Sequence, residues 1–308
     1  MSPTESSPSA TPEVRLPDFL AIGAMKCGTT TLYRDLLGQP GLYLPDKESN
    51  ALLAADPAAA LARLTDGAPA DGLTGEVCPD YTKPGLDLRA AAAARQLYAG
   101  RRAPRLIFLA REPIARLLSH HHFISTQQGA GNPGGMTRDL AASLRDFPEL
   151  IETSRYAARL APWVEAFGRE SLLVLRFEDY IADRAGTLGR IAAFIGHPGF
   201  AAARIEARRV YNAGVARPVA TPGWRRILGN SLYRRWVRPL LPIGLRDHLR
   251  DRLLPKAPPR PSPPDRERLR ELAESLKPDV AALSCLLGQD EPLWDLDRAV
   301  ETLAAGEP

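Results

Sequence analysis

The sequence predicts an α/β fold, a single domain built as a three-layer α/β/α sandwich with a central parallel sheet. Short apolar runs at residues 19–22, 104–111 and 172–177 have the length and composition of buried strands. Segments with helical spacing of apolar residues separate these runs, and strands joined by crossover helices pair in parallel. The first run also ends in a glycine-bounded loop that opens a helix, which is a P-loop-like arrangement.

Charge, hydropathy and cysteine spacing limit the classes of function. The 308 residues carry 40 Lys and Arg against 36 Asp and Glu, and this net charge of +4 suits anionic ligands without requiring nucleic acid. No apolar run is long enough for an integral membrane segment, and the first residues lack the features of a signal peptide. The three cysteines lie far apart and have no metal-ligand spacing. We therefore expect a cytoplasmic protein without a metal, and the Ala-, Arg- and Pro-rich composition indicates a bacterial source.

The first loop departs from an ATP-binding Walker loop at one position. Gly23 and Gly28 hold the glycine spacing of G-x4-G-K-[ST], and Thr30 occupies the Ser/Thr position. Thr29 stands where the lysine belongs, and the lysine of this loop is Lys26. ATP hydrolysis is therefore disfavoured, whereas one phosphate or a phosphosulfate suits a loop with an earlier lysine. The alternative is a phosphate loop of another kind of nucleotide-binding protein.

The run AIGAMKCGTTTLY resembles the 5′-phosphosulfate loop of sulfotransferases that use 3′-phosphoadenosine 5′-phosphosulfate (PAPS). With a cysteine directly after the lysine, this loop is similar to the form found in the carbohydrate (heparan-type) and bacterial branch of that family. The resemblance implies that Lys26 contacts the bridging oxygen and the 5′-phosphate and assists catalysis. The other residues that it implies for the cofactor are Cys27, Gly28, Thr29, Thr30 and Thr31.

A charged pair follows the first helix, in a short extended piece at residues 41–50. Lys47-Glu48 resembles the Lys-Glu pair of the carbohydrate-type enzymes, and Asn50 fits the usual K-E-x-N form. The resemblance implies that Glu48 is the general base for the acceptor hydroxyl, with Lys47 beside the substrate. The aromatic residues that usually follow are replaced by residues 51–53, Ala-Leu-Leu. The alternative is a Lys-Glu pair on the surface of a loop.

An Ala-rich helix is expected within residues 51–70, and residues 73–84 have the pattern of a strand end and a turn. This segment resembles the family pattern G-E-x-[ST]-P-x-Y, which implies that Glu76 and Tyr81 lie at the acceptor site. Val77 occupies the position of a catalytic lysine in heparan-type enzymes, so that role is not carried over. The alternative is a purely structural turn.

A second motif follows the strand at 104–111, after a helix expected at 88–100. Residues 111–119 match the pattern R-x-P-x-x-R-x-x-S, which resembles the 3′-phosphate motif of the same family. It implies that Arg111 and Ser119 anchor the 3′-phosphate, because an arginine makes charge-assisted bonds to phosphate oxygens. Arg116 is expected to brace the structure.

The histidines at 120–122 are ordinary helix positions rather than a metal site, because adjacent helical residues point in different directions. Residues 126–139 are Gly-rich and predict a mobile loop. Helices are expected at 156–167 and 184–196, and Glu178-Asp179 between them is assigned a structural role.

We expect the whole chain to be divided as follows. Residues 1–16 are a disordered tail, 17–297 the domain and 298–308 a second tail. Residues 203–264 form a variable basic region, which could cover the adenosine, meet an acidic lipid or carrier, or be a solvated helical face. Asp265 is expected to cap a helix at 266–276, and Pro278 to open another.

Together these motifs predict a sulfotransferase that moves the sulfuryl group of PAPS to an acceptor hydroxyl and releases 3′,5′-ADP. The acceptor would be a small molecule or a glycan, that is, a carbohydrate or a secondary metabolite. Two alternatives stay open: a non-catalytic protein that binds PAP or PAPS, and a P-loop phosphotransferase that uses Mg-ATP. The sequence does not indicate the oligomeric state.

Overall fold

The computed structural model describes residues 15–127, 132, 134–200, 223, 249, 252–254 and 264–306. A five-stranded sheet with the order β2-β3-β1-β4-β5 forms its centre, and all its pairings are parallel. The strands are β1 (Phe19–Gly23), β2 (Leu42–Tyr43), β3 (Leu73–Val77), β4 (Arg105–Ala110) and β5 (Leu172–Arg176). The α/β sandwich predicted from the sequence is therefore confirmed.

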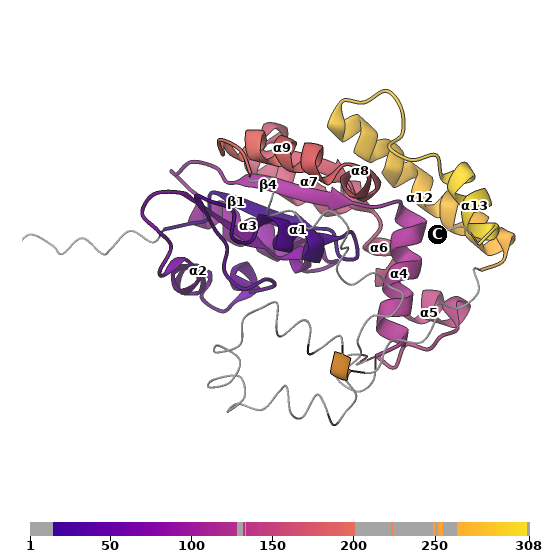
Figure 1. Ribbon diagram of the computed structural model, residues 1–308. Helices are drawn as coiled ribbons and strands as arrows, with labels where there is room; N and C mark the ends of the chain where they lie inside the picture. Colours follow the sequence, from indigo (N-terminus) through magenta and orange to yellow (C-terminus); the bar gives the residue numbers. More distant parts are fainter. Residues whose placement is uncertain are drawn as a thin grey trace, which may run out of the picture.

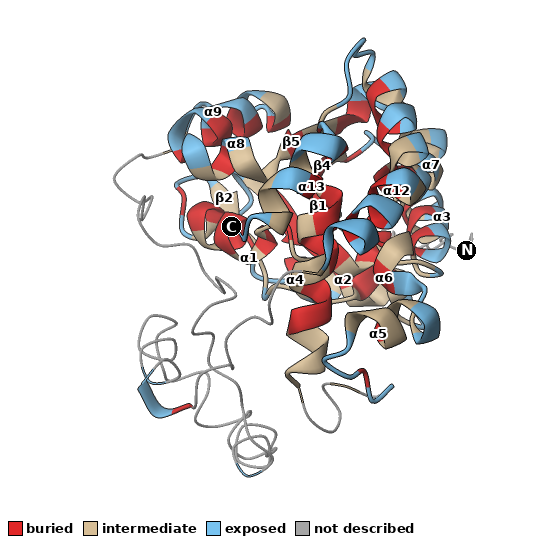
Figure 2. Cartoon of the chain, turned by 90° about the vertical axis from the view of Figure 1, so that its right-hand side faces the viewer, coloured by how far each residue is buried: buried red, intermediate tan, exposed pale blue. Residues whose placement is uncertain are grey.

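Helices connect the strands and cover both faces of the sheet. The α-helices are α1 (Thr29–Leu36), α2 (Pro57–Thr65), α3 (Asp87–Leu97), α4 (Pro113–Ser125), α5 (Leu140–Asp146), α6 (Glu149–Glu152), α7 (Tyr156–Phe167), α8 (Phe177–Ala182), α9 (Arg184–Ile195), α12 (Arg266–Leu287) and α13 (Leu296–Ala304). Short 3₁₀ turns are η1 (Ala51–Leu53), η2 (Pro79–Thr82) and η4 (Arg169–Ser171). In Figure 2, α8 and α9 lie on one side of the strands and α3, α7 and α12 on the other.

The strands β1, β3 and β4 are almost completely buried, because helices cover both of their faces. Their packing depends on a glycine: Phe19 of β1 pairs with Gly75 of β3, and a Cβ atom on Gly75 would stand 2.0 Å from the Phe19 ring. The near-continuous apolar runs in the sequence are the trace of this double coverage.

A buried ionic cluster joins α1 to α8 and α9. Arg184 of α9 forms an ion pair with Asp35 of α1, and its Nε donates to the same carboxylate at 3.0 Å. The hydroxyl group of Tyr180 in α8 also donates to Asp35. Three elements that are far apart in the sequence therefore share one carboxylate in the interior.

The carboxy-terminal helices differ from the expectation. Residues 266–287 form one helix, α12, with Pro278 inside it, so the prediction that a new helix begins at Pro278 was wrong. The physical reason lies in Asp279, whose two carboxylate oxygens accept the backbone amides of Ala157 and Ala158 at the start of α7. Asp279 therefore caps another helix instead of opening its own.

The helix α13 continues past residue 297, where the sequence placed the end of the domain. Leu296 and Val300 of this helix are buried in the core, so apolar packing extends the folded part into the expected tail. In Figure 1, α12 and α13 lie beside α4. Most of the basic region 203–264, a large part of the predicted amino-terminal tail and part of the loop 126–139 lie outside the described residues. Within the described part, no helix has the length and apolarity needed to cross a membrane.

Candidate functional site

The carboxyl ends of the parallel strands meet at one edge of the sheet, and the predicted site residues follow three of these ends. The predicted phosphate loop, residues 24–28, follows β1, the segment with Glu76 and Tyr81 belongs to β3 and η2, and Arg111 follows β4. The register pairs Ala21 with Val77 and Gly23 with Phe108, which brings the ends of β3, β1 and β4 side by side. Ligands of open α/β sheets bind at this edge.

The loop after β1 has two residues in the left-handed region: Lys26 with φ 71° and Gly28 with φ 87°. A Cβ atom on Gly28 would stand 2.7 Å from the ring of Phe177, so glycine is required there for space as well as for backbone conformation. The amide of Cys27 donates to the carbonyl oxygen of Ala24 at 3.3 Å, which closes the turn. The loop is thus a tight turn that leads directly into α1.

The amino-terminal end of α1 differs from those of most other described helices. Gly28 is its N-cap, makes no side-chain capping bond, and the first turn contains no acidic residue. In contrast, α2, α4, α5, α9, α12 and α13 begin with an Asp or Glu whose carboxylate accepts first-turn amides. An anion at a helix amino-terminus is stabilised by the amides and the helix dipole. The first turn of α1 carries Thr29, Thr30 and Thr31 and brings no anion of its own.

Two cations of the site lie against aromatic rings. The amine of Lys26 lies 4.1 Å from the centroid of the Phe123 ring in α4, and the guanidinium of Arg111 lies 5.1 Å from that of Phe177. Arg111 is half-buried and forms no ion pair with any residue in the described ranges. A positive charge held on a ring and left without a carboxylate is typical of a site for an external anion.

Tyr156 of α7 connects the two phosphate motifs. Its hydroxyl group donates to the carbonyl oxygen of Arg111 at 2.7 Å and lies 3.7 Å from Sγ of Cys27. Burial raises the pKa of the Cys27 thiol to about 11, so this side chain is a neutral, core-facing group at physiological pH. Because the side chain of Cys27 points into the core, its backbone is the part of the residue that lines the loop. A contact of Cys27 with the cofactor stays a prediction.

Arg116 is a bracing residue, as expected. Its buried guanidinium donates to the hydroxyl of Ser154 at 2.7 Å and to the carbonyl oxygen of Leu150 at 2.5 Å, and it contacts Nδ1 of His120 at 3.3 Å. Burial, followed by the Arg116 charge, holds the pKa of His120 well below its usual range, so the imidazole is neutral. Ser119, on the same helix, is half-buried.

The three adjacent histidines of α4 do not converge. His120 faces Arg116, whereas His121 contacts the carbonyl oxygen of Thr137 at 3.0 Å and the hydroxyl of Ser143 at 3.2 Å. Among the described residues, no group of three His, Cys, Asp or Glu side chains is arranged to hold a metal ion.

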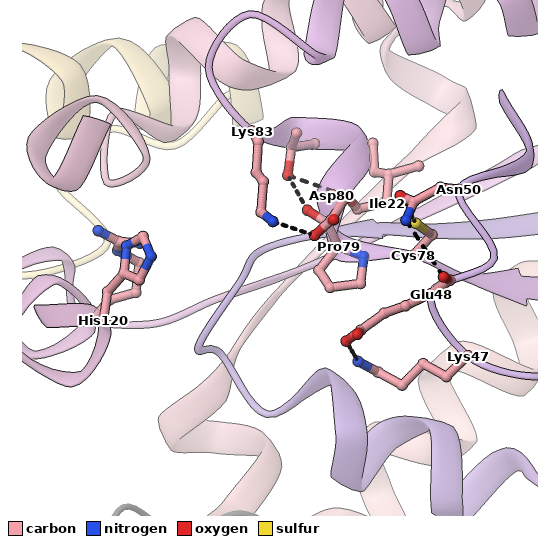
Figure 3. A network of polar contacts seen from close by, with 11 residues as sticks. Ile22, Lys47, Glu48, Asn50, Cys78, Pro79, Asp80, Lys83 and His120 are labelled. Carbon is pink, nitrogen blue, oxygen red and sulfur yellow. Dashed lines mark hydrogen bonds and ion pairs between the residues drawn. The ribbon is translucent and has the colours of Figure 1, made fainter. Parts of the chain in front are cut away.

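Glu48 lies in the connection between β2 and η1 and reaches the same edge of the sheet. Its backbone amide donates to the carbonyl oxygen of Val77 at 3.0 Å, at the end of β3. Lys47 forms an ion pair with the Glu48 carboxylate (Figure 3). The side chain of Glu48 is 53 % exposed and that of Lys47 is 12 % exposed. The acidic group is therefore open to solvent, whereas its lysine partner is largely covered.

Backbone strain concentrates at this edge. Within the described part of the chain, the non-glycine residues with positive φ are Lys26 (71°), Glu48 (63°) and Asn50 (56°). Such conformations cost energy and persist where the surroundings impose them, which is typical of functional sites. The strain thus marks the phosphate loop and the Glu48 segment independently of any sequence motif.

Glu76 and Tyr81 are buried and support the Glu48 segment from behind. The carboxylate of Glu76 accepts hydrogen bonds from the hydroxyl groups of Ser49 and Tyr81, the latter at 2.7 Å. Burial raises the pKa of Glu76, and hydrogen bonds from Ser49 and Tyr81 oppose that shift. A direct contact of Glu76 or Tyr81 with an acceptor stays a prediction, whereas their contacts with the segment are described here.

Sequence motifs did not identify several residues of the site: Phe123, Tyr156, Phe177 and Ser49. Phe177 directly follows β5, so its place at the carboxyl edge of a parallel strand was a usable signal. Tyr156 belongs to an apolar helix pattern and gave no signal, because its hydroxyl bonds to Arg111 across 45 positions. Glu178, expected to be structural, accepts from the Glu112 amide at 2.9 Å and from Nε1 of Trp294 at 3.3 Å.

Comparisons with known proteins agree with this architecture. Residues 96–209, somewhat over a third of the chain, match the sulfotransferase domain family, and no curated protein sequence matches the chain. The fold is similar to a sulfotransferase from Alicyclobacillus acidocaldarius, with a TM-score of 0.57 and 19% identity over 90% of this chain and 98% of that one.

Two more distant similarities are to mouse sulfotransferase SULT7A1 complexed with PAP (TM-score 0.42, 17% identity, 63% of each chain) and to the sulfotransferase domain of the Synechococcus PCC 7002 olefin synthase (TM-score 0.40, 17% identity, 76% of this chain and 92% of that one). The prediction from the sequence is confirmed to this extent: residues 96–209 match the sulfotransferase domain family, and the fold of the chain is similar to that of a sulfotransferase.

Proposed function

We propose that this protein transfers the sulfuryl group of PAPS to the hydroxyl group of a carbohydrate or secondary-metabolite acceptor and releases 3′,5′-ADP. The family supports sulfuryl transfer in general, and the finer assignment rests mainly on one observation. Arg111, without a carboxylate partner in the described chain, lies on Phe177, and Phe177 also packs against Gly28 of the phosphate loop. Two anion subsites on neighbouring strands fit a nucleotide with phosphate at both its 3′ and 5′ positions.

The residues present fit the donor. Lys26 and the first turn of α1, which brings no acidic residue, would hold the 5′ end, and Arg111 with Ser119 would hold the 3′-phosphate. PAPS would supply the sulfuryl group. Lys26 and the amides of the loop would stabilise the negative charge that develops on the leaving 5′-phosphate, which is the role of fixed donors where charge appears. The proposal assigns no step to a metal ion.

Glu48 would accept the proton of the acceptor hydroxyl. A general base must lie within hydrogen-bond reach of that proton and keep its own proton affinity in a range useful for transfer. The Glu48 carboxylate is paired with Lys47, and the 53 % exposure of its side chain leaves one side open to solvent. A bound acceptor, by covering this open side, would remove water from the carboxylate and strengthen its interaction with the hydroxyl group.

Two other functions would use the same architecture. A non-catalytic PAP- or PAPS-binding protein would need the two anion subsites but not Glu48, and the absence of aromatic residues at 51–53 keeps it a genuine alternative. A phosphotransferase would need Mg-ATP, and Thr29 in place of the Walker lysine speaks against it. The cytoplasmic location and the bacterial source are proposals made on the sequence alone.

Calorimetric titration with 3′,5′-ADP, 5′-ADP and Mg-ATP tests the donor assignment. We expect binding of 3′,5′-ADP to be tighter than that of 5′-ADP, since only the former reaches the Arg111 subsite. Incubation with PAPS and a mixed panel of sugar and phenol hydroxyls then tests turnover by release of 3′,5′-ADP. A preference for Mg-ATP, or equal affinity for the two ADP isomers, would overturn the donor assignment. Tight 3′,5′-ADP binding without turnover on any acceptor would favour the non-catalytic alternative.

A further inference from the structure

Two chains of hydrogen bonds lead from the turn that follows Glu48 to one oxygen atom of Glu76. The amide of Leu52 donates to the Tyr81 hydroxyl at 3.1 Å, and that hydroxyl donates to Oε1 of Glu76. The amide of Ala51 donates to the Ser49 hydroxyl at 3.1 Å, which donates to the same Oε1. Both amides belong to η1, so one carboxyl group of β3 anchors the start of this turn through two hydroxyl groups.

The anchored segment is the strained one. Glu48 and Asn50 both have positive φ, and they stand directly before η1. Further contacts come from the same side: Sγ of Cys78 donates to the Asn50 amide oxygen at 3.3 Å (Figure 3), and the Glu48 amide donates to the carbonyl oxygen of Val77. A left-handed conformation at a non-glycine residue persists when neighbouring groups determine it. The β3–η2 segment supplies these groups.

The contacts of Glu76 with the described residues indicate no other role. It is 1 % exposed, so its side chain does not reach the open side of the site. Its second oxygen, Oε2, is buried and has no hydrogen-bond partner among the residues that the structure describes. A buried carboxyl group with one unsatisfied oxygen is a costly way to stabilise a fold. Its two hydroxyl partners, however, both lead to the Glu48 segment.

We propose that Glu76 is a positioning residue, which acts through Ser49 and Tyr81 to hold Glu48 in the orientation required of a general base. This inference rests on the proposed function, in which Glu48 accepts the acceptor proton. Glu76 itself would not contact the acceptor. Because the phosphate loop and Arg111 belong to other elements, loss of Glu76 should lower turnover and leave nucleotide binding unchanged.

The structure offers a matched pair of variants. In Glu76→Gln, the amide oxygen can accept both hydroxyl groups, and the new amide nitrogen takes the place of an oxygen that already lacks a partner. In Glu76→Leu, a side chain of similar size accepts neither bond. The positioning role therefore predicts that the glutamine variant keeps function and the leucine variant loses it. A role that required the negative charge itself would make both variants equally defective.

The experiment combines hydrogen–deuterium exchange, calorimetry and turnover. For Glu76→Leu we expect faster exchange in the peptide covering residues 47–53, unchanged exchange in the β4 peptide at 105–110, and unchanged affinity for 3′,5′-ADP. We expect kcat for release of 3′,5′-ADP from PAPS, with the best acceptor of the panel, to fall by about 10- to 100-fold, the range that follows from misplacing a reacting group. Glu76→Gln should match the wild type in all four measurements.

Each outcome decides between the alternatives. Wild-type turnover in Glu76→Leu, or equal loss in the glutamine variant, overturns the positioning role. If the wild type does not consume PAPS with any acceptor, the proposed function fails, and the exchange measurement still tests whether Glu76 holds the segment. Should Glu76→Leu fail to fold, Ser49→Ala removes one of the two hydroxyl groups at a half-buried position. That variant must then show the faster exchange at 47–53, and unchanged exchange there overturns the inference.

Discussion

The hydroxyl group of Tyr156 donates a hydrogen bond to the backbone carbonyl oxygen of Arg111 at 2.7 Å. The hydroxyl oxygen of Tyr156 also lies 3.7 Å from Sγ of Cys27 in the phosphate loop. One buried side chain therefore fixes the distance between the loop after β1 and the motif after β4. Because the two motifs are proposed to hold opposite ends of one nucleotide, their spacing is part of the recognition of that ligand.

Tyr156→Phe should weaken binding of 3′,5′-ADP by about 2- to 10-fold, the value of one lost hydrogen bond. Calorimetric titration of the variant measures this effect. Tyr98→Phe is a matched control, since the Tyr98 hydroxyl donates to the carbonyl oxygen of Pro17 at 2.6 Å, before the start of β1 and away from the site. Both variants should lose some stability, and only Tyr156→Phe should lose affinity. Equal affinity in the two variants would refute the connecting role of Tyr156.

Arg111→Ala should reduce the affinity for 3′,5′-ADP by about 10- to 150-fold, the range for losing a hydrogen bond to a charged group. Affinity for 5′-ADP should not change, because that ligand has no 3′-phosphate. The control is Arg105→Ala, at the opposite end of β4, where the guanidinium donates to the carbonyl oxygen of Glu170. A parallel loss of affinity for both nucleotides would show that Arg111 supports the fold instead of the 3′-phosphate.

Glu48→Gln should lower kcat for sulfuryl transfer by about 100- to 10,000-fold, the contribution of a general base. The affinity for 3′,5′-ADP should stay the same. Asp46→Asn, an exposed carboxylate two positions earlier, should leave kcat unchanged. Release of 3′,5′-ADP from PAPS is the measurement, and a Glu48→Gln variant with normal turnover would remove Glu48 as the base.

The thiol of Cys27 should make the fold less stable at alkaline pH. Burial raises its pKa to about 11, whereas in the unfolded chain a thiol titrates near about 8.5. Between these values the unfolded state loses a proton that the folded state keeps, so rising pH favours unfolding by about 1.4 kcal/mol per pH unit. The contribution of the neutral Cys27 thiol to stability is fully present below pH about 8.5 and is lost by pH about 11.

Urea unfolding at pH 8 and at pH 10 measures that dependence. Between the two pH values, the free energy of unfolding should fall less in Cys27→Ala than in the wild type. The difference should be about 1.4 kcal/mol for each pH unit above about 8.5. The comparison uses the change with pH, so the cavity left by the smaller side chain cancels. An equal fall in both proteins would contradict the assignment of the alkaline transition to Cys27.

Asp35→Ala should cost about 3–5 kcal/mol in the free energy of unfolding, because it removes one partner of a buried ion pair. Both side chains are 3 % exposed. In contrast, Arg268→Ala removes an exposed pair with Glu271 on α12 and should cost less than about 1 kcal/mol. Urea denaturation of the two variants checks the difference, and similar small costs would mean that the α1–α9 cluster relaxes to admit water.

The sequence predicted those features that depend on neighbouring residues. The apolar run of β1, the glycine loop with Lys26 and the motif from Arg111 to Ser119 are each local, and their strand–loop–helix context is confirmed. Features that depend on contacts between distant segments were missed or wrong. A new helix was expected at Pro278 because the bonds of Asp279 to α7, which join residues more than 100 positions apart, cannot be seen in the local sequence.

The predicted site shows the same division. The spacing of motifs indicated which side chains come to the carboxyl edge of the sheet, but not which way each one points. Cys27 lies in the phosphate loop and turns its thiol into the core, and Glu76 lies in a motif and turns its carboxyl group toward Ser49 and Tyr81. Sequence spacing carries position along the chain, whereas orientation depends on the packing of α7 and η2 against the sheet.

The contacts of Glu178 bear on the order in which the protein is made. Its carboxylate accepts hydrogen bonds from the Glu112 amide and from Trp294. The Arg111 motif is therefore connected, through Glu178, to a residue that is synthesised about 180 positions later. During translation the proposed nucleotide site would therefore lack this support until Trp294 has emerged from the ribosome. The segment 96–209, which carries the family signature, would also lack both the phosphate loop and Trp294 if it were expressed alone. Recombinant fragments for ligand screening should accordingly include both the phosphate loop and Trp294.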